Sequence, residues 1–321
     1  MIGQILIALA AGCASAAMFA SITSGALISL VLLYLSPLPL MVAAIGWGPV
    51  CAAIGGGLAA IALGAAFGIG DLIGYAIAIA LPSWWLGHLC LLGRPTAGDA
   101  AGSAAPGHAM EWYPVGRILL WSAGLAALAV SAALLTLGTD AKAIAGTLHD
   151  YFLRILASND VSASPDVERL VDAIVSFVPS AAAMMTTLTY ALNLWLAGKV
   201  AATSGRLSRP WPDLKAIALP PMTLVLLCVV LALCFSGGLP AVLARIAASA
   251  LLVTYGLTGF AVLHTLTLTL KSRPFWLGSA YAFVLAFGWP MLAMTALGLA
   301  DAVFGLRQRY LRSHPPPLPI P

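Results

Sequence analysis

The feature that most constrains this chain is an apolar stretch that runs from Ile2 to Gly93 with almost no charge. Asp71 is its single acidic residue, and no lysine or arginine occurs before Arg94. A helix on a soluble domain needs one apolar face, whereas these segments are apolar on all sides. Because a bilayer core about 30 Å thick takes roughly 20 such residues per helix, the stretch has room for about four spans. The sequence therefore predicts an integral membrane protein.

Composition supports the same class. Hydrophobic residues make up 61% of the 321 residues and charged residues only 8%. Soluble domains carry about 25% charged residues, so this composition excludes an ordinary soluble fold. The net charge of +4 falls in a few loops. Nucleic-acid binding needs clustered lysine and arginine on a folded domain, so we expect the lipid bilayer and no nucleic acid as partner.

Motifs for catalysis and metal binding are missing. The chain has no P-loop, no HExxH and no GxSxG sequence. Its five cysteines lie in apolar segments without a CxxC pair, as expected of small hydrophobic residues. We therefore expect no enzymatic activity, no cofactor and no metal site.

Breaks in the apolar pattern divide the chain into four parts. Residues 1–92 are predicted to form an N-terminal block of four spans. Residues 93–116, rich in Gly, Ala, Ser and Pro, are expected to be a flexible cytoplasmic linker. A C-terminal membrane block, 117–312, and a Pro-rich tail, 313–321, follow. The predicted fold class is all-α, a polytopic transmembrane helix bundle of about eight to ten spans.

Prolines predict where spans are broken. Pro37 and Pro39 should kink or split the second span. The block 275–305 is long for one helix and short for two, and Gly288-Trp289-Pro290 favours two short halves. Two halves would return the C-terminus to the side from which the block started. The block 240–270 is expected to be one tilted helix.

The section 138–176 is predicted to lie outside the membrane and to contain two amphipathic helices. It holds six acidic residues against three basic ones. Apolar residues recur at helical spacing from Ile144 to Ile155 and again from Val167 to Val178, and Ser164-Pro165-Asp166 is a helix-start signal. The two helices could cover an external mouth, or they could lie passively at the membrane surface.

Basic residues set the expected orientation. They gather in three places: 199–215, 271–273 and 307–312. The positive-inside rule puts these segments in the cytoplasm and the acidic section 138–176 outside. Counting back through four spans then places the N-terminus in the cytoplasm.

Charged residues inside a membrane are functional candidates because each costs about 2.5–3.5 kcal/mol to insert. Asp71 and Arg245 fall near the outer ends of their predicted spans, where they could pair or together hold a zwitterionic or anionic ligand. Tyr255 is a third candidate ligand-binding residue. The alternative is that Asp71 and Arg245 are separately hydrated at the interface.

Small residues predict close helix contacts. In the first span Ala10 and Ala14 form a small-xxx-small pair, and Gly55-Gly56-Gly57 has the same character in the third. These positions could pack the bundle tightly, or the first span could contact another membrane subunit.

Three stretches together resemble a known family. They are Ser36-Pro37-Leu38-Pro39-Leu40 with Gly46-Trp47-Gly48, the segment Tyr255–Leu263 around Gly259, and the segment Gly298–Arg309 with Asp301, Arg307 and Arg309. They resemble motifs of the YybS-like family of bacterial membrane proteins, a domain of unknown function. That family is similar in apolar pattern to the substrate-binding subunits of energy-coupling-factor transporters. The resemblance implies a bacterial inner-membrane location and binding of a small molecule from outside.

Residues and resemblance together lead to one expected function and one alternative. We expect a non-enzymatic role in binding or transporting a small molecule of unknown identity. The alternative is a structural or regulatory membrane protein that acts through helix contacts or its basic C-terminal segment, without transport.

Overall fold

The computed structural model describes residues 2–95, 110–159 and 164–313. Helices dominate these residues, and the strands described are two short ones that pair with each other. The prediction of an all-α polytopic bundle is confirmed. Seven helical segments of the described residues are long and apolar enough to cross a membrane: Ile2–Ser24, Leu27–Trp47, Pro49–Phe67, Ile69–Leu91, Val115–Leu135, Pro165–Thr203 and Gly238–Leu266.

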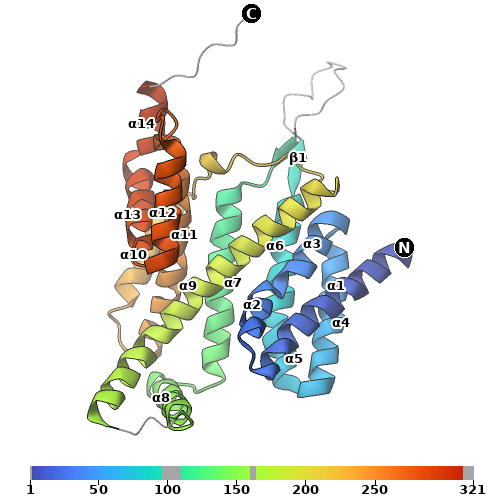
Figure 1. Cartoon of the computed structure of the whole chain (residues 1–321), viewed down its shortest axis with the longest axis vertical. Coiled ribbons are helices and arrows are strands. Elements are labelled where there is room, and N and C mark those ends of the chain that lie inside the picture. The colour runs from blue at the N-terminus through green and yellow to red at the C-terminus, as the bar shows by residue number, and fades with distance from the viewer. Residues whose placement is uncertain (1, 96–109, 160–163, 314–321) are drawn as a thin grey trace, which may run out of the picture.

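The N-terminal helices pack against one another on one side of the molecule (Figure 1). They are α1 (Ile2–Ala20), α2 (Leu27–Leu35), α3 (Pro37–Trp47), α4 (Pro49–Phe67), α5 (Ile69–Tyr75) and α6 (Leu81–Leu91), with a 3₁₀ turn, η1 (Ser21–Ser24), after α1 and a π-helical segment, η2 (Ala76–Ala80), before α6. The predicted break in the second span is present, because α2 ends at Leu35 and α3 begins at Pro37.

Small residues bring α1 and α4 together, but through a different face of α1 than expected. A Cβ added at Gly12 would collide with the carbonyl oxygen of Gly55, and one added at Gly55 would collide with that of Ala8. Ala10 and Ala14 are exposed, so the expectation that they form a helix contact within this chain is wrong. Because α1 is apolar on every side, its sequence does not indicate which face packs.

The ends of the predicted linker are strands. β1 (Gly93–Pro95) pairs antiparallel with β2 (Met110–Trp112), and Arg94 forms a 2.8 Å ion pair with Glu111. Flexibility was expected for these ends too, but backbone pairing holds them together. The rest of the predicted linker, 96–109, lies outside the described residues. α7 (Val115–Leu135) begins shortly after β2.

The acidic section contains one separate helix rather than two. α8 (Ala141–Ala157) is amphipathic and lies across one end of the bundle (Figure 1). The side chain of its residue Ile144 is buried. The second predicted surface helix is instead the beginning of α9 (Pro165–Thr203), which continues without interruption through the membrane-spanning segment. The start signal at Ser164 was correct, since its side chain accepts from the Val167 N–H at 3.3 Å. The expected boundary near residue 177 was wrong.

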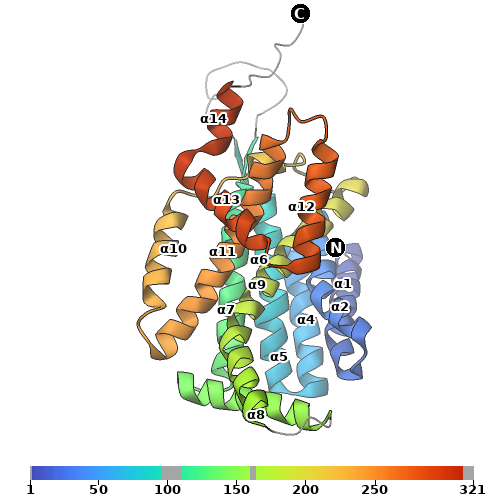
Figure 2. The same ribbon diagram turned by 60° about the vertical axis from the view of Figure 1, so that its left-hand side comes forward.

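The C-terminal helices lie on the other side of α7 and α9 (Figure 1). They are α10 (Met222–Leu233), α11 (Gly238–Leu266), α12 (Arg273–Phe287), α13 (Met291–Phe304) and α14 (Leu306–Ser313), preceded by a 3₁₀ turn, η4 (Leu214–Ala216). The block 240–270 is a single long helix, as predicted. The predicted break at Gly288-Trp289-Pro290 is present, and the turn between α12 and α13 lies between the two ends of the bundle in both views (Figure 2). α12 and α13 therefore form a re-entrant pair.

The two ends of the bundle differ in charge. One end carries the β ladder, the 204–221 loop and α14, and we call it the basic end; the other carries α8 and the start of α9, and we call it the acidic end (Figure 1). Of the proposed Pro-rich tail, only Ser313 is described, at the end of α14.

Candidate functional site

A cavity of about 470 Å³ opens at the acidic end, between α8, α9 and the turn that joins α10 to α11. Ile144 and Leu148 of α8 and Val175 of α9 supply apolar wall. The polar side chains that line it are Asp172, Ser176, Ser180, Cys234 and Arg245. The size falls in the range of small-molecule pockets. α8 thus contributes to the wall of this opening.

Charge of both signs lines this cavity. Arg245 reaches it from α11 and Asp172 from α9, and the two form no ion pair with each other among the described residues. The Asp172 carboxylate lies 3.5 Å from His149 Nε2 and is 74% exposed. A guanidinium can bind a carboxylate or phosphate with two parallel hydrogen bonds. The arrangement offers an anion site and a separate cation site inside one opening.

Proline adds a backbone acceptor to the wall. Pro179 lies inside α9 and lines the cavity together with Val175, four residues earlier. Proline has no N–H, so the Val175 carbonyl loses its regular helical donor. Backbone groups freed in this way inside a membrane are tolerated where they line a cavity or meet other donors. The wall therefore has hydrogen-bonding capacity beyond its side chains.

The structure separates the residues predicted to form this site. Arg245 lines the cavity, but Asp71 lies in α5 of the N-terminal helices and forms no ion pair with Arg245 or with any other described residue. The predicted Asp71–Arg245 pair is therefore wrong. Tyr255 is 1% exposed in the core between α7, α9 and α11 and does not line the cavity. Its proposed role as a ligand-binding residue has no geometric support.

Sequence reasoning missed Asp172 and Cys234 as cavity residues, and it missed His149 as the side chain that lies 3.5 Å from the Asp172 carboxylate. Asp172 is one of six acidic residues in a polar section, and nothing in the local pattern distinguishes it from the others. No local signal places Asp172 on the same helix as the span, because Pro179 and the change from an amphipathic to an apolar pattern resemble a helix boundary.

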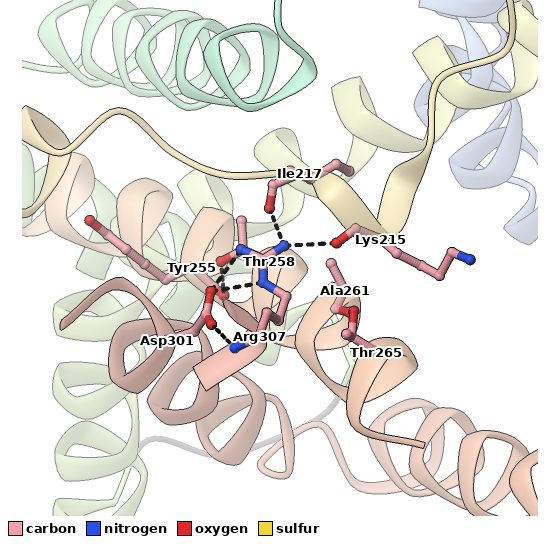
Figure 3. Close-up of polar contacts among 8 residues, drawn as sticks. All are labelled: Lys215, Ile217, Tyr255, Thr258, Ala261, Thr265, Asp301 and Arg307. Atoms are coloured by element: carbon pink, nitrogen blue, oxygen red, sulfur yellow. Dashed lines mark hydrogen bonds and ion pairs between the residues drawn. The ribbon is translucent and has the colours of Figure 1, made fainter. Parts of the chain in front are cut away.

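A second polar centre lies at the basic end (Figure 3). Arg307 Nε donates to Asp301 Oδ2 at 2.8 Å, and the Arg307 backbone N–H donates to Asp301 Oδ1 at 2.9 Å. The guanidinium also donates to the carbonyl oxygens of Lys215 and Ile217 at 2.8 and 2.7 Å. The side chain of Asp301 is only 9% exposed and that of Arg307 only 13% exposed. This pair joins α13, α14 and the loop before α10.

The other motif residues of this region pack α11 against α13. A Cβ at Gly259 would collide with the Met294 carbonyl oxygen, and one at Gly298 would collide with that of Tyr255. Arg309 is exposed and its side chain has no partner among the described residues. Gly259, Asp301 and Arg307 therefore have structural roles, and Arg309 is free to meet water or a partner.

Lysine and arginine side chains lie over tryptophan rings at the basic end. The Lys199 ammonium lies 4.2 Å from the centre of the Trp211 ring, and the Arg206 guanidinium lies 5.1 Å from that of Trp47. Burial lowers the pKa of Arg209, which donates to the Cys90 carbonyl oxygen at 3.3 Å. Tryptophan and basic residues are typical of a membrane–water interface.

Metal binding has no candidate in the part of the chain that the structure describes. No group of three or more His, Cys, Asp or Glu side chains lies close enough there to hold an ion. The five cysteines are free thiols.

The long apolar helices and their arrangement define a polytopic α-helical membrane protein. Residues 157–302, somewhat under half of the chain, match the model of a family described as "Predicted membrane protein (DUF2232)". No curated protein and no solved structure matches the chain. The match includes α9, α10, α11, α12 and most of α13, so it covers most of the cavity wall and the Gly259–Gly298 contact.

Proposed function

We propose that this protein binds a small polar molecule in the cavity at its acidic end, and that this end faces the outside of a bacterial inner membrane. The observation that carries the proposal is Arg245, which has no ion-pair partner among the described residues and lines a cavity that Asp172 also lines. A zwitterionic molecule or an anion matches these charges. The role is binding or transport without catalysis, as the resemblance to substrate-binding subunits implies.

Charge distribution supports the orientation. The segments 199–215, 271–273 and 307–312 all belong to the basic end, because the re-entrant pair returns α14 to it (Figure 1). The positive-inside rule assigns that end, together with the N-terminus, to the cytoplasm. Six acidic and three basic residues in 138–176 fit the outer side.

A ligand screen with a matched pair of variants tests the proposal. Purified protein in detergent is melted in the presence of amino acids, carboxylates, phosphate esters and neutral controls. A ligand present at 100 times its Kd stabilises by about 2.7 kcal/mol, which raises the melting temperature measurably. Arg245→Gln should abolish this rise, whereas Arg169→Gln should preserve it, because Arg169 is an exposed arginine on α9 that pairs with Asp166 outside the cavity.

Two results would contradict the proposal. One is that no zwitterion or anion raises the melting temperature of the parent protein. The other is that a compound does so equally in the parent and in Arg245→Gln, which would place its site elsewhere.

A structural or regulatory role is the second candidate, and α12 is the observation that favours it. No residue of α12 is buried, and Phe275, Trp276 and Phe283 are more than half exposed. Tyr281 stacks on Phe260 and is hydrogen-bonded to His264 Nε2 at 2.9 Å, and Val284 packs against the core cluster that contains Phe260. Copurification of another membrane protein that is lost on Phe283→Ala, with no ligand found in the screen, would favour this role.

A further inference from the structure

A groove, separate from the cavity at the acidic end, lies between α7, α10 and α11. Its volume is about 560 Å³, and its lining is mainly apolar, with Leu226 and Val230 on one wall. The floor is made of small residues, among them Ala123, Gly124 and Ala127. It is separate from the cavity at the acidic end, since the two share no lining residue.

The groove is about as long as one leaflet of a bilayer is thick. It begins at the basic end with Tyr113, Arg117 and Pro220 and reaches Ala127 on α7. The ten residues from Arg117 to Ala127 rise about 15 Å along the helix. That is half of a hydrocarbon core about 30 Å thick. A lipid of one leaflet fits this length, whereas a spanning helix of a partner would need a groove through both leaflets.

The end of the groove nearest the basic end carries a cation that has no ion-pair partner among the described residues. Arg117 is exposed and has no ion pair within the described ranges; its guanidinium lies 6.0 Å from the centre of the Tyr113 ring. Trp121 lies one turn deeper and its Nε1 donates to the Tyr113 hydroxyl at 3.3 Å. Arginine is suited to phosphate, and aromatic rings suit headgroup depth.

Backbone contacts hold this end of the groove open in a fixed shape. A Cβ at Gly116 would collide with the carbonyl oxygen of Ala218, so α7 begins directly against the loop that precedes Pro220. Arg307 holds the same loop through its bonds to the Lys215 and Ile217 carbonyl oxygens (Figure 3). The groove is therefore built by the fold and does not depend on a mobile side chain.

We propose that this groove is a binding site for one anionic glycerophospholipid of the leaflet at the basic end, with its phosphate on Arg117 and one acyl chain along Gly124 and Ala127. The charge of the exposed Arg117, the apolar walls and the one-leaflet length together select this occupant. The proposal is independent of the ligand that the cavity at the acidic end binds.

Native mass spectrometry of the full-length, delipidated protein titrated with dioleoyl phosphatidylglycerol or dioleoyl phosphatidylcholine tests it. The parent should retain one phosphatidylglycerol with at least fivefold preference over phosphatidylcholine. Gly124→Leu fills the groove, and a Cβ at Gly124 meets no atom within 4 Å, so the variant should fold and lose at least fivefold in retention of either lipid. Gly57→Leu is the control, because Gly57 is an exposed helix glycine with equally open space outside the groove.

Arg117→Gln tests the headgroup separately. It should remove the preference for phosphatidylglycerol while Lys271→Gln, an exposed cation at the same end, preserves it. Equal retention in Gly124→Leu and the parent would overturn the proposal, as would an unchanged preference in Arg117→Gln. Dissociation of an oligomer on Gly124→Leu, without loss of lipid, would show that a protein helix fills the groove and would also overturn it.

Discussion

Arg307 joins three segments of the chain that are distant in sequence. Its guanidinium bonds the Asp301 carboxylate and two carbonyl oxygens of the loop before α10, and its own backbone N–H bonds the same carboxylate. Gly305, at a φ of 63°, makes the turn that brings Arg307 back over Asp301. Because both side chains are largely buried, removing either one would leave the charge of the other uncompensated.

Asp301→Asn should therefore destabilise the protein more than loss of a surface charge would. We expect a loss of about 3 kcal/mol, because removing one partner of a buried pair typically costs 3–5 kcal/mol. Arg309→Gln, two residues from Arg307 but exposed, should change stability by less than about 0.5 kcal/mol. Melting in detergent, followed by tryptophan fluorescence, measures both. Equal melting temperatures for the two variants would contradict the structural role of the pair.

At the scale of helices, side chains of α9 donate hydrogen bonds to two backbone carbonyl oxygens in the N-terminal block. Pro82 has no N–H for the Ala78 carbonyl four residues earlier, and the Tyr190 hydroxyl donates to that carbonyl oxygen at 2.7 Å. Near the break at Pro37, Asn193 Nδ2 donates to the Tyr34 carbonyl oxygen at 2.8 Å. Polar groups of a neighbouring helix thus satisfy backbone groups that the lipid could not.

A double-mutant cycle tests whether the Tyr190 hydroxyl replaces the N–H donor that Pro82 lacks. Tyr190→Phe should cost about 1 kcal/mol, as expected for a hydrogen bond between membrane helices. In a Pro82→Ala background the new N–H can bond the Ala78 carbonyl, so the same change should cost much less. Thermal melting of the parent, the two single variants and the double variant gives the coupling. Additive effects would show that Tyr190 contributes only by packing.

Local sequence signals predicted where helices begin and end better than they predicted which helices contact one another. The break at Gly288-Trp289-Pro290 was predictable because a proline follows closely on a glycine, the residue that most readily adopts a positive φ, here 70° at Gly288. The length of α9 was not, because Pro179 and the change from amphipathic to apolar pattern resemble a boundary. Ala10, Ala14 and Asp71 failed for another reason: helices that are apolar on all sides do not indicate their inward face or their neighbours.

At the scale of the molecule, the two ends of the bundle differ in their polar groups. The acidic end has a cavity lined by both signs of charge, whereas the basic end has tryptophan–cation contacts and the Asp301–Arg307 pair. The position of Arg245 was partly predictable, because a charge in an apolar span is conspicuous. Its surroundings were not, since they come from α8, α9 and the turn before α11.

The most direct test of the central claim uses Cys234, a native thiol in the cavity wall. The other four cysteines are changed to alanine, and an impermeant maleimide is applied to right-side-out and to inverted vesicles. We predict labelling of Cys234 only in right-side-out vesicles. A Gln308→Cys control, introduced at the basic end with Cys234 also replaced, should label only in inverted ones. Labelling of Cys234 from the cytoplasmic side, or from neither side, would contradict an outward-facing, water-accessible cavity.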